Sequence, residues 1–378
     1  MNDKKKNLHI LVCYERNRGG ETKATEAIYR ELSKNKSLKL KISSSEPLSR
    51  TDFLGYFSWI LAGISQWARV ILLNRKTDWV YTTTFTAGFA ATLFKPWPNF
   101  KICFHYHGNR LPEKEGKLTQ WIKYKVTFWL HQFFLKRVDL ILTPSNYSKN
   151  FLKKQFSTIK DKKMVVISNG VDLKVFKPVL LRTKLALRKK YNIDRNGKVI
   201  LAIGRLNKEK RVDRLFPVIS LLKNEISNIL LLIAYPKEDT KDEKIYKRKL
   251  EKQITGLEIS DYIMWLSGEK NVANIYAVSD FVVLASKKEN FPLIMLEALA
   301  SKVIFVSTPV GGVKQILPNI DKRLVIKNTK PKALSEQLNS VLNLSNRQKN
   351  IIHQKGHKLA LKHSWEKTAK GLLASLSN

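Results

Sequence analysis

Short apolar runs alternate with helix-like segments along almost the whole chain, and this rhythm limits the possible folds more than any other feature of the sequence. The apolar runs of the first half are residues 8–14, 38–42, 79–83, 100–105, 140–143 and 164–167. Those of the second half are residues 198–203, 229–234, 263–266, 281–285 and 303–307. Near-continuous apolar runs of this length, separated by helical patterns, are typical of parallel strands that are covered on both faces. The sequence therefore predicts an α/β protein in which parallel sheets lie between layers of helices.

The 378 residues are too many for one small core and indicate two domains. A turn at residues 169–172 and the sequence Phe176-Lys177-Pro178 separate the two series of strands. We therefore predict doubly wound domains at residues 1–178 and 179–362, and a final helix within 363–378 that crosses back to the first domain. Sheets of this kind bind ligands at the carboxyl ends of their strands, so the expected site is the crevice between the domains.

The formal net charge is +38, and the excess of Lys and Arg is spread over both halves of the chain. So strong a positive field predicts nucleic acid or an anionic membrane surface as a partner, although a lysine-rich composition can also serve solubility alone. The cysteines Cys13 and Cys103 both lie in apolar runs and show neither metal-ligand spacing nor a disulfide framework. A reducing cytosol is the simplest location for such a chain.

Two segments bear on membrane contact. Residues 53–73 are mostly apolar, but Ser58, Ser65 and Arg69 recur at helical spacing, so a packed crossover helix, a membrane-surface helix and a membrane span all stay open. Residues 118–137 mix aromatic and basic side chains, which suits a helix at a lipid interface and equally a crossover helix whose aromatics fill the core. The candidates there for contact with membrane or acceptor are Trp121, Lys123, Lys125, Trp129, Lys136 and Arg137.

A basic loop follows the first strand of the second half. Gly204 and Arg205 come directly after residues 198–203, Lys210 follows five residues later, and a helix is expected over 208–222. Arg presents a planar fork to two phosphate oxygens and Lys presents a mobile point charge, so both suit a pyrophosphate at a strand-to-helix junction. The alternative is an ordinary basic loop in a lysine-rich protein.

The first half offers weaker signals at the ends of its strands. Gly19 and Gly20 occupy the equivalent strand-to-helix junction, where glycine lets the backbone approach a ligand closely. His105 and His107 lie at the end of the run 100–105, where an imidazole can hydrogen-bond a sugar hydroxyl or serve a structural role.

Two glutamates separated by seven residues, Glu289 and Glu297, give the most specific chemical signal. Pro292 suits the first turn of a helix, which would place Glu297 about one and a half turns inside that helix. The free N–H groups at the helix start then face a ligand, while the two carboxylates accept hydrogen bonds from its hydroxyls. The pattern suits a polyhydroxylated, phosphorylated ligand, and a solvated acidic helix start is the alternative.

Taken in order, these motifs resemble the C-terminal half of glycosyltransferase family 4, whose retaining enzymes have the GT-B architecture of two Rossmann-like domains facing a central cleft. The matching stretches are residues 167–172, 202–206 with Lys210, 289–297 and 308–312, and in outline Gly19-Gly20 and His107-Gly108 of the first half. The resemblance covers most of the chain, and the ordered set is far more specific than any single motif.

The resemblance implies a role for each matching residue. Arg205 and Lys210 would bind the donor's diphosphate, Glu289 would contact the hydroxyls of the donor sugar, and His107 would face that sugar from the first domain. These four are the implied catalytic residues. The implied donor-binding residues are Gly19, Gly20, Gly204, Leu266, Gly268, Asn290, Phe291, Leu293 and Glu297, with Glu297 on the nucleotide ribose.

Two positions depart from the family pattern. Asn290 stands where Gly is usual, and Gln315 stands where an acid is usual. Asn accepts unusual backbone angles better than most residues, and Gln keeps a hydrogen-bond acceptor but loses a charge. Both changes bear on the identity of the donor sugar more than on the reaction class.

The resemblance implies a retaining hexosyltransferase that moves a sugar from a nucleotide-diphosphate sugar to a hydroxyl of a lipid-linked or polysaccharide acceptor, as in cell-envelope glycan or lipopolysaccharide synthesis. No Asp-x-Asp sequence stands out, so neither a metal nor another cofactor is expected. Together with the net charge, this predicts a cytoplasmic enzyme bound peripherally to the inner face of the plasma membrane, with no nucleic acid partner. A basic nucleic-acid-binding protein and a GT-B nucleotide-sugar epimerase or phosphorylase are the alternatives.

Overall fold

The computed structural model describes residues 6–13, 19–45, 77–93, 100–108, 118–159, 163–237 and 240–377. The chain divides into two compact units: unit 1 is Met1–Asn169 with Trp365–Asn378, and unit 2 is Gly170–Ser364. The apolar segment 53–73, whose nature the sequence leaves open, lies outside the described residues.

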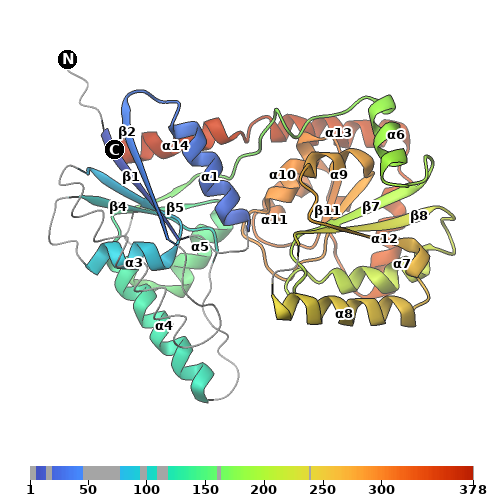
Figure 1. Cartoon of the computed structure of the whole chain (residues 1–378), viewed down its shortest axis with the longest axis horizontal. Helices are drawn as coiled ribbons and strands as arrows, with labels where there is room; N and C mark the ends of the chain where they lie inside the picture. Colours follow the sequence, from blue (N-terminus) through green and yellow to red (C-terminus); the bar gives the residue numbers. More distant parts are fainter. Residues whose placement is uncertain are drawn as a thin grey trace. The chain divides into compact units, whose positions relative to one another are not determined.

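Unit 1 contains a six-stranded parallel sheet (Figure 1). Its strands in spatial order are β2 (Leu38–Ser45), β1 (Lys6–Cys13), β3 (Trp79–Thr82), β4 (Lys101–His105), β5 (Leu140–Thr143) and β6 (Met164–Val166). One face of the sheet carries α1 (Gly20–Leu32) and α14 (Trp365–Ser377), and the other carries α3 (Phe85–Leu93) and α4 (Leu118–Arg137). A further helix, α5 (Asn146–Gln155), precedes β6. Helix α14 therefore joins unit 1 although it ends the chain.

Unit 2 contains a five-stranded parallel sheet. Its spatial order is β11 (Ile304–Ser307), β10 (Phe281–Leu284), β7 (Lys198–Ile203), β8 (Ile229–Tyr235) and β9 (Ile263–Ser267). The chain runs from β7 outward to β9 and then resumes beside β7 with β10, so the direction of winding reverses between β7 and β10. The prediction of an α/β protein with doubly wound sheets is confirmed.

The helices of unit 2 cover both faces of its sheet (Figure 1). On one face lie α7 (Phe216–Leu222), α8 (Lys241–Gly256) and α12 (Pro331–Leu342). On the other lie α6 (Leu181–Lys190), α9 (Val272–Val278), α10 (Leu293–Ala300) and α13 (Asn346–Ala360), and α11 (Val313–Ile320) follows β11. Because both faces are covered, the strands are apolar on both sides: every residue of β10 and β11 is buried.

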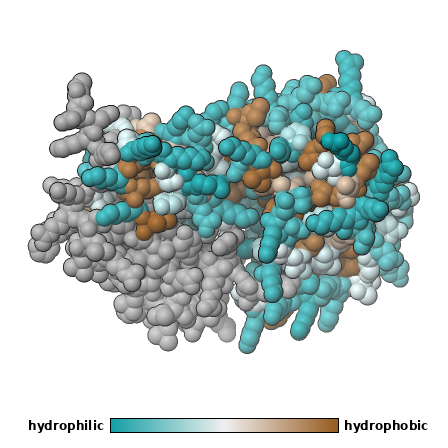
Figure 2. All heavy atoms as spheres, turned by 45° about the horizontal axis from the view of Figure 1, so that its top comes forward, coloured by the Kyte–Doolittle hydropathy of each residue, from teal (hydrophilic) through white to brown (hydrophobic). Residues whose placement is uncertain are grey.

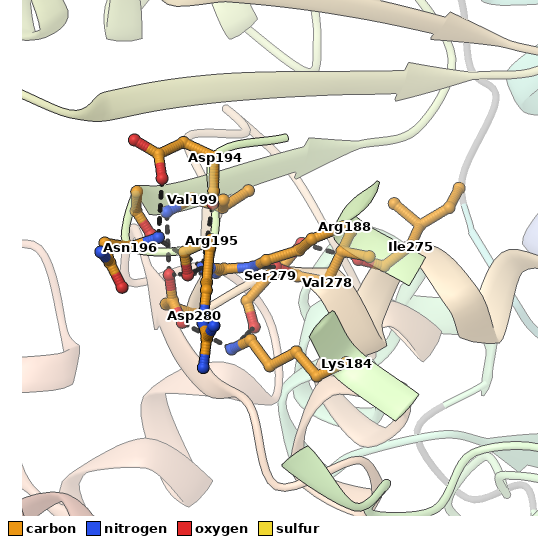
Figure 3. A network of polar contacts seen from close by, with 11 residues as sticks. Lys184, Arg188, Asp194, Arg195, Asn196, Val199, Ile275, Val278, Ser279 and Asp280 are labelled. Atoms are coloured by element: carbon orange, nitrogen blue, oxygen red, sulfur yellow. Dashed lines mark hydrogen bonds and ion pairs between the residues drawn. The ribbon is translucent and has the colours of Figure 1, made fainter. Parts of the chain in front are cut away.

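A buried arginine fixes the amino-terminal edge of the unit 2 sheet (Figure 3). Arg188 of α6 is 4% exposed, and its Nη2 lies 2.8 Å from Oδ2 of Asp280, the residue before β10. Asp280 also accepts hydrogen bonds from Lys184 Nζ at 2.6 Å and from the backbone N–H of Val199 in β7 at 2.9 Å. The guanidinium donates as well, over 2.9 to 3.0 Å, to the backbone carbonyls of Val278, Arg195 and Gly197.

The helix predicted over residues 208–222 is wrong in its first half. A 3₁₀ turn occupies Val212–Leu215, and α7 begins only at Phe216. Arg211, just before the turn, adopts a left-handed conformation with φ +49°, which reverses the chain and prevents an earlier helix start. Pro217 then lies in the first turn of α7, where its missing N–H costs no helical hydrogen bond.

The surface of the described part is mainly hydrophilic on the face that Figure 2 shows, with apolar side chains in small groups. Among the helices within the described residues, none is both long enough and apolar enough to cross a bilayer.

Candidate functional site

The loops that follow β7 and β10 meet at the carboxyl edge of the unit 2 sheet, at the point where its winding reverses (Figure 1). Doubly wound sheets bind their ligands at this point. The backbone N–H of Lys287 donates to the carbonyl oxygen of Glu209 over 2.8 Å and so joins the two loops. A small pocket lies at the ends of β7 and β10. Residues of both strands line it, together with Gly204, Arg205 and Lys210 of the loop that follows β7.

An ion pair connects two predicted site residues that are far apart in the sequence. Lys210 Nζ lies 2.6 Å from Glu289 Oε1, and the two side chains are 29% and 14% exposed. Gly204 makes room for this lysine: its φ of +147° suits glycine, and Cε of Lys210 would lie 3.4 Å from a Cβ placed there. Arg205 is half-buried and has no ion-pair partner among the described residues. Among the described residues, the loop therefore offers one cation that a carboxylate holds and a second cation that forms no ion pair.

The loop that carries Glu289 is anchored from β11. Gly311 has φ +50°, and a Cβ at this position would overlap the carbonyl oxygens of Glu289 and Asn290. The N–H of Gly312 donates to the Asn290 carbonyl over 2.8 Å. Asn290 itself is not among the residues with positive φ, so its replacement of the usual glycine causes no backbone strain. Gln315, the other departure, lies in the first turn of α11 with an exposed side chain.

Glu297 lies in the second turn of α10, where sequence reasoning expected it, and has a partner that sequence reasoning missed. The Tyr276 hydroxyl on α9 donates to Glu297 Oε2 over 2.5 Å. Burial, and then the neighbouring carboxylate, raise the pKa of the Tyr276 phenol well above its ordinary value, so the phenol stays protonated. This bond fixes the orientation of the Glu297 carboxylate. A tyrosine 21 residues upstream carries no sequence signal that links it to the acid.

The remaining predicted donor-binding residues of unit 2 lie at the same edge of the sheet or begin α10. Leu266 is in β9, two strands from β7, and Gly268 follows β9 with φ +67° and donates its N–H to the Tyr235 carbonyl over 2.9 Å. Phe291 is buried, with its ring 5.8 Å from the His363 ring. Leu293 is the first residue of α10, and Pro292 is the N-cap and not, as expected, part of the first turn.

The predicted site residues of unit 1 follow the ends of β1 and β4. His107 is partly exposed just after β4, and desolvation of its ring lowers its pKa to about 4, so the imidazole is neutral at pH 7. Gly19 has an extended conformation at the N-cap of α1 and offers no side-chain cap, and Gly20 is the first residue of that helix. Residues 14–18, which precede them, lie outside the described part of the chain.

Within the described residues, no three His, Cys, Asp or Glu side chains come together as metal ligands would.

Helix α4 divides its aromatic residues between the core of unit 1 and solvent, so its aromatics fill the core in part, and contact with a lipid interface stays a prediction. Tyr124 and Phe134 are buried, and the Phe134 ring lies 4.9 Å from the ring of Phe104 in β4. Trp121 is 48% exposed and Trp129 is 61% exposed.

Basic and aliphatic side chains accompany the exposed tryptophans. Lys125 Nζ lies 5.2 Å from the centre of the Trp121 ring, and Lys136 and Arg137 are exposed at the end of the helix. Ile122 and Val126 are also about half exposed. The side chain of Lys123 lies outside the described part of the structure.

Two family models match the chain. The model of "Glycosyl transferases group 1" matches residues 183–358, and that of "Glycosyltransferase Family 4" matches residues 34–175. Each match lies largely within one unit, and together they span most of the chain.

Characterised relatives share modest identity. N-acetyl-alpha-D-glucosaminyl L-malate synthase of Bacillus anthracis is 27% identical over 193 residues, which is 51% of this chain and 47% of the relative. Lipopolysaccharide 1,2-N-acetylglucosaminetransferase of Salmonella typhimurium is 22% identical over 291 residues, which is 74% of this chain and 68% of the relative. The chain thus spans about half the length of the first of these relatives.

Solved structures share the fold of the whole chain. The sucrose-phosphate synthase of Thermosynechococcus elongatus has a TM-score of 0.83 at 15% identity, with 97% of each chain covered. The Anabaena protein HepE, solved with UDP and glucose, has a TM-score of 0.75 at 16% identity, with 98% of this chain and 99% of that chain covered. The predicted GT-B arrangement of two Rossmann-like folds is confirmed.

Proposed function

The chain belongs to glycosyltransferase family 4, and from this premise we propose that it is a retaining hexosyltransferase, which transfers a sugar from a nucleotide-diphosphate sugar to an acceptor hydroxyl. The observation that carries the proposal is the cluster of Arg205, Lys210 and Glu289 at the switch point of the unit 2 sheet. A diphosphate needs cations and a sugar needs hydroxyl acceptors, and this edge of the sheet supplies both, the cations in the pocket and Glu289 paired with one of them.

The reaction places its largest new charge on the departing phosphate. When the glycosyl–phosphate bond breaks, negative charge grows on the leaving oxygen, and Arg205 and Lys210 stabilise that charge in a partly dehydrated pocket. Arg205 is free to form a two-point contact with the phosphate. Lys210 supplies its remaining N–H donors while Glu289 holds the ammonium in place.

The rest of the donor fits the same edge of the sheet. We assign the ribose hydroxyls to Glu297, whose orientation Tyr276 fixes, and the sugar hydroxyls to Glu289 and the backbone N–H groups of Asn290, Phe291 and Leu293. UDP is the nucleotide we favour, because HepE was solved with UDP and glucose. We further propose front-face attack with retention, in which the leaving phosphate oxygen takes the proton of the acceptor hydroxyl.

The proposal needs no metal, because two basic side chains face the diphosphate in the way that a divalent cation otherwise would. Turnover in the presence of EDTA should therefore equal turnover without it.

Replacement of the two cations tests the proposal. Arg205→Ala and Lys210→Ala should each lower kcat at least 100-fold, because each removes a charge that acts mainly in the transition state. Lys208→Ala is the matched control, since Lys208 is an exposed lysine of the same loop and should turn over normally. Release of nucleotide from a panel of UDP-, GDP- and ADP-sugars gives the rate. Near-normal turnover in both alanine variants would refute the mechanism, and product analysis separates transfer from epimerisation or phosphorolysis.

We propose that the acceptor is lipid-linked or a cell-envelope polysaccharide and that the enzyme meets it on the cytoplasmic face of the plasma membrane. Exposed tryptophans beside lysines and an arginine on α4 suit the headgroup region of an anionic bilayer. The net charge of +38 acts in the same direction. The similarity to a lipopolysaccharide glycosyltransferase supports an acceptor of this class.

Liposome sedimentation tests the membrane contact. The variant Trp121→Ser/Trp129→Ser should bind vesicles that contain phosphatidylglycerol several-fold more weakly than the unaltered protein, because it loses two large interfacial side chains. Ile245→Ser is the matched control, since Ile245 on α8 is 63% exposed but belongs to unit 2. Binding should also weaken as the salt concentration rises. Equal binding by both variants, or no binding at low salt, would exclude α4 as the contact.

A further inference from the structure

A row of buried polar side chains lies behind His107 and has no part in the proposed reaction. Tyr81 on β3 and His105 on β4 are 0% and 1% exposed, and Tyr81 Oη lies 2.8 Å from His105 Nδ1. The ring of His105 in turn lies against the ring of His107, with centroids 4.2 Å apart and planes tilted by 40°. The row of Tyr81, His105 and His107 thus runs from the middle of the sheet to its carboxyl edge, where His107 lies.

Stability alone does not account for these residues. Tyr81 pairs in register with Cys103, and Val80, Ile102 and Phe104 of the same two strands are apolar and buried. A polar group in such a place costs free energy unless its hydrogen bonds are complete. His105 Nε2 is buried and has no hydrogen-bond partner among the described residues, so only one side of its imidazole is satisfied. Such an incompletely paired group calls for an explanation other than packing.

We propose that Tyr81 and His105 are positioning residues, which hold the imidazole of His107 in the orientation that the transfer reaction requires. The proposal rests on the proposed function and on the role that the family resemblance implies for His107, which is contact with the donor sugar. Neither residue touches the substrate, and both act through the ring of His107.

The geometry explains how the row works. Burial, and then the neighbouring Cys103 and Glu21, raise the pKa of Tyr81, so its phenol stays protonated and shares a hydrogen bond with His105 Nδ1. That bond fixes the plane of the His105 ring, against which His107 packs. Burial lowers the pKa of both imidazoles, so two neutral rings meet without charge repulsion. A rigid neutral imidazole at the sheet edge can exchange hydrogen bonds with a sugar hydroxyl without first losing a proton.

Kinetics of Tyr81→Phe, His105→Phe and the double variant test the proposal. Each single variant should lower kcat about tenfold and leave the KM for the donor within about twofold, because His107 is misplaced but not removed. The kcat of the double variant should be no lower than that of either single variant, because Tyr81 acts on His107 only through His105. Thr25→Val is the matched control: it removes another buried hydroxyl of unit 1, which bonds to Thr83 at 3.0 Å, and should keep the original kcat.

Imidazole nitrogen-15 NMR of the folded proteins gives a readout that a purely structural role would not change. The tautomer and the pKa of His107 should shift in Tyr81→Phe although residue 107 is unaltered, and the acid limb of kcat should shift with that pKa. Unchanged kcat and unchanged His107 resonances in folded Tyr81→Phe and His105→Phe would overturn the proposal. His107→Ala separates failure of the role of His107 from failure of the positioning proposal. Full activity of His107→Ala would refute the role of His107 itself. An inactive His107→Ala together with a fully active Tyr81→Phe would refute only the positioning by Tyr81 and His105.

Discussion

At the scale of single residues, the pairing of Lys210 with Glu289 decides how the site is prepared for its ligand. A carboxylate 2.6 Å from the ammonium holds that lysine in one orientation before a phosphate arrives. Arg205 has no ion-pair partner within the part of the chain that the structure describes and can turn its whole guanidinium toward the phosphate. The two cations of one loop are therefore not equivalent, since one is held in place and the other is available.

Gly311 is the residue whose backbone conformation the site most depends on. In Gly311→Ala the new Cβ would overlap the carbonyl oxygens of Glu289 and Asn290 at a φ of +50°, so the loop that carries Glu289 must move. We expect kcat/KM to fall at least tenfold and the free energy of unfolding to fall by about 1–2 kcal/mol. Steady-state kinetics and urea denaturation measure both quantities.

Gly256→Ala is the control for this substitution. Gly256 ends α8, and a Cβ there meets no atom within 4 Å, so its activity and stability should stay the same or rise slightly. If Gly311→Ala behaves like this control, the glycine does not constrain the site.

At the scale of helices and strands, the sequence indicates most of the fold because the same pattern, an apolar strand followed by a helix, is repeated along the chain. Strands buried on both faces are apolar at every position, and β5 and β7 have the predicted bounds, residues 140–143 and 198–203. The predicted start of helix α7 was wrong because the residue with the left-handed conformation is Arg211, and only a glycine or asparagine there would have indicated such a conformation from the sequence. Tertiary context, not local propensity, sets that boundary.

The site was predictable as a set of residues but not as a set of contacts. Arg205 and Lys210 were identified from their place after a strand, and Glu289 from its spacing to Glu297 ahead of a helix start. The ion pair between the last two joins positions 79 residues apart, and the bond from Tyr276 to Glu297 joins two helices. Such contacts depend on strand order, which places β10 beside β7 and which periodicity does not reveal.

The amino-terminal edge of the unit 2 sheet should be as important for stability as its carboxyl edge is for function. Arg188→Met leaves Asp280 with one cation fewer and frees three carbonyls, so we expect a loss of about 3–5 kcal/mol in the free energy of unfolding. Turnover per folded molecule should not change, because the substitution lies at the opposite edge from the site. Urea denaturation and active-site titration measure the two effects.

Arg182→Met provides the comparison on the same helix. Arg182 is exposed on α6, and its replacement should change stability by less than about 0.5 kcal/mol. Equal stability of the two variants would show that the buried network contributes nothing beyond a surface charge.

At the scale of the whole molecule, the net charge and the residues of the candidate site point to the protein's partners in different ways. A charge of +38 draws nucleic acid and anionic membranes alike, and therefore does not select between them. The binding site that we propose, with the paired Glu289 and Lys210 and with Glu297 held by a tyrosine, suits a neutral, hydroxyl-rich group beside a phosphate. The absence of a nucleic acid partner stays a prediction.

The buried histidines of unit 1 should make this unit lose stability in mild acid. Burial lowers the pKa of His107 and of His131 to about 4, although the bond from His131 Nδ1 to the Thr127 carbonyl partly opposes this for His131. The pKa of His105 is lowered well below its ordinary value. In the unfolded chain each imidazole titrates near pH 6.5. The unfolded state therefore binds more protons below pH 6.5, so the stability of unit 1 is complete above that pH and falls as the pH drops toward about 4.

His131→Phe tests this assignment of the acid sensitivity. The ring centres of His131 and Phe85 lie 3.7 Å apart in a stacked pair, so phenylalanine keeps the stacking and removes the titrating group together with its bond to the Thr127 carbonyl. Each histidine should contribute a slope of up to about 1.4 kcal/mol per pH unit between about pH 6 and 4.5, and the variant should lose one such contribution. Urea titrations at a series of pH values, followed by amide hydrogen exchange of β4 and β5, measure the slope for unit 1. If His131→Phe has the same slope as the unaltered protein, His131 is charged in the folded state and the acid sensitivity lies in other groups.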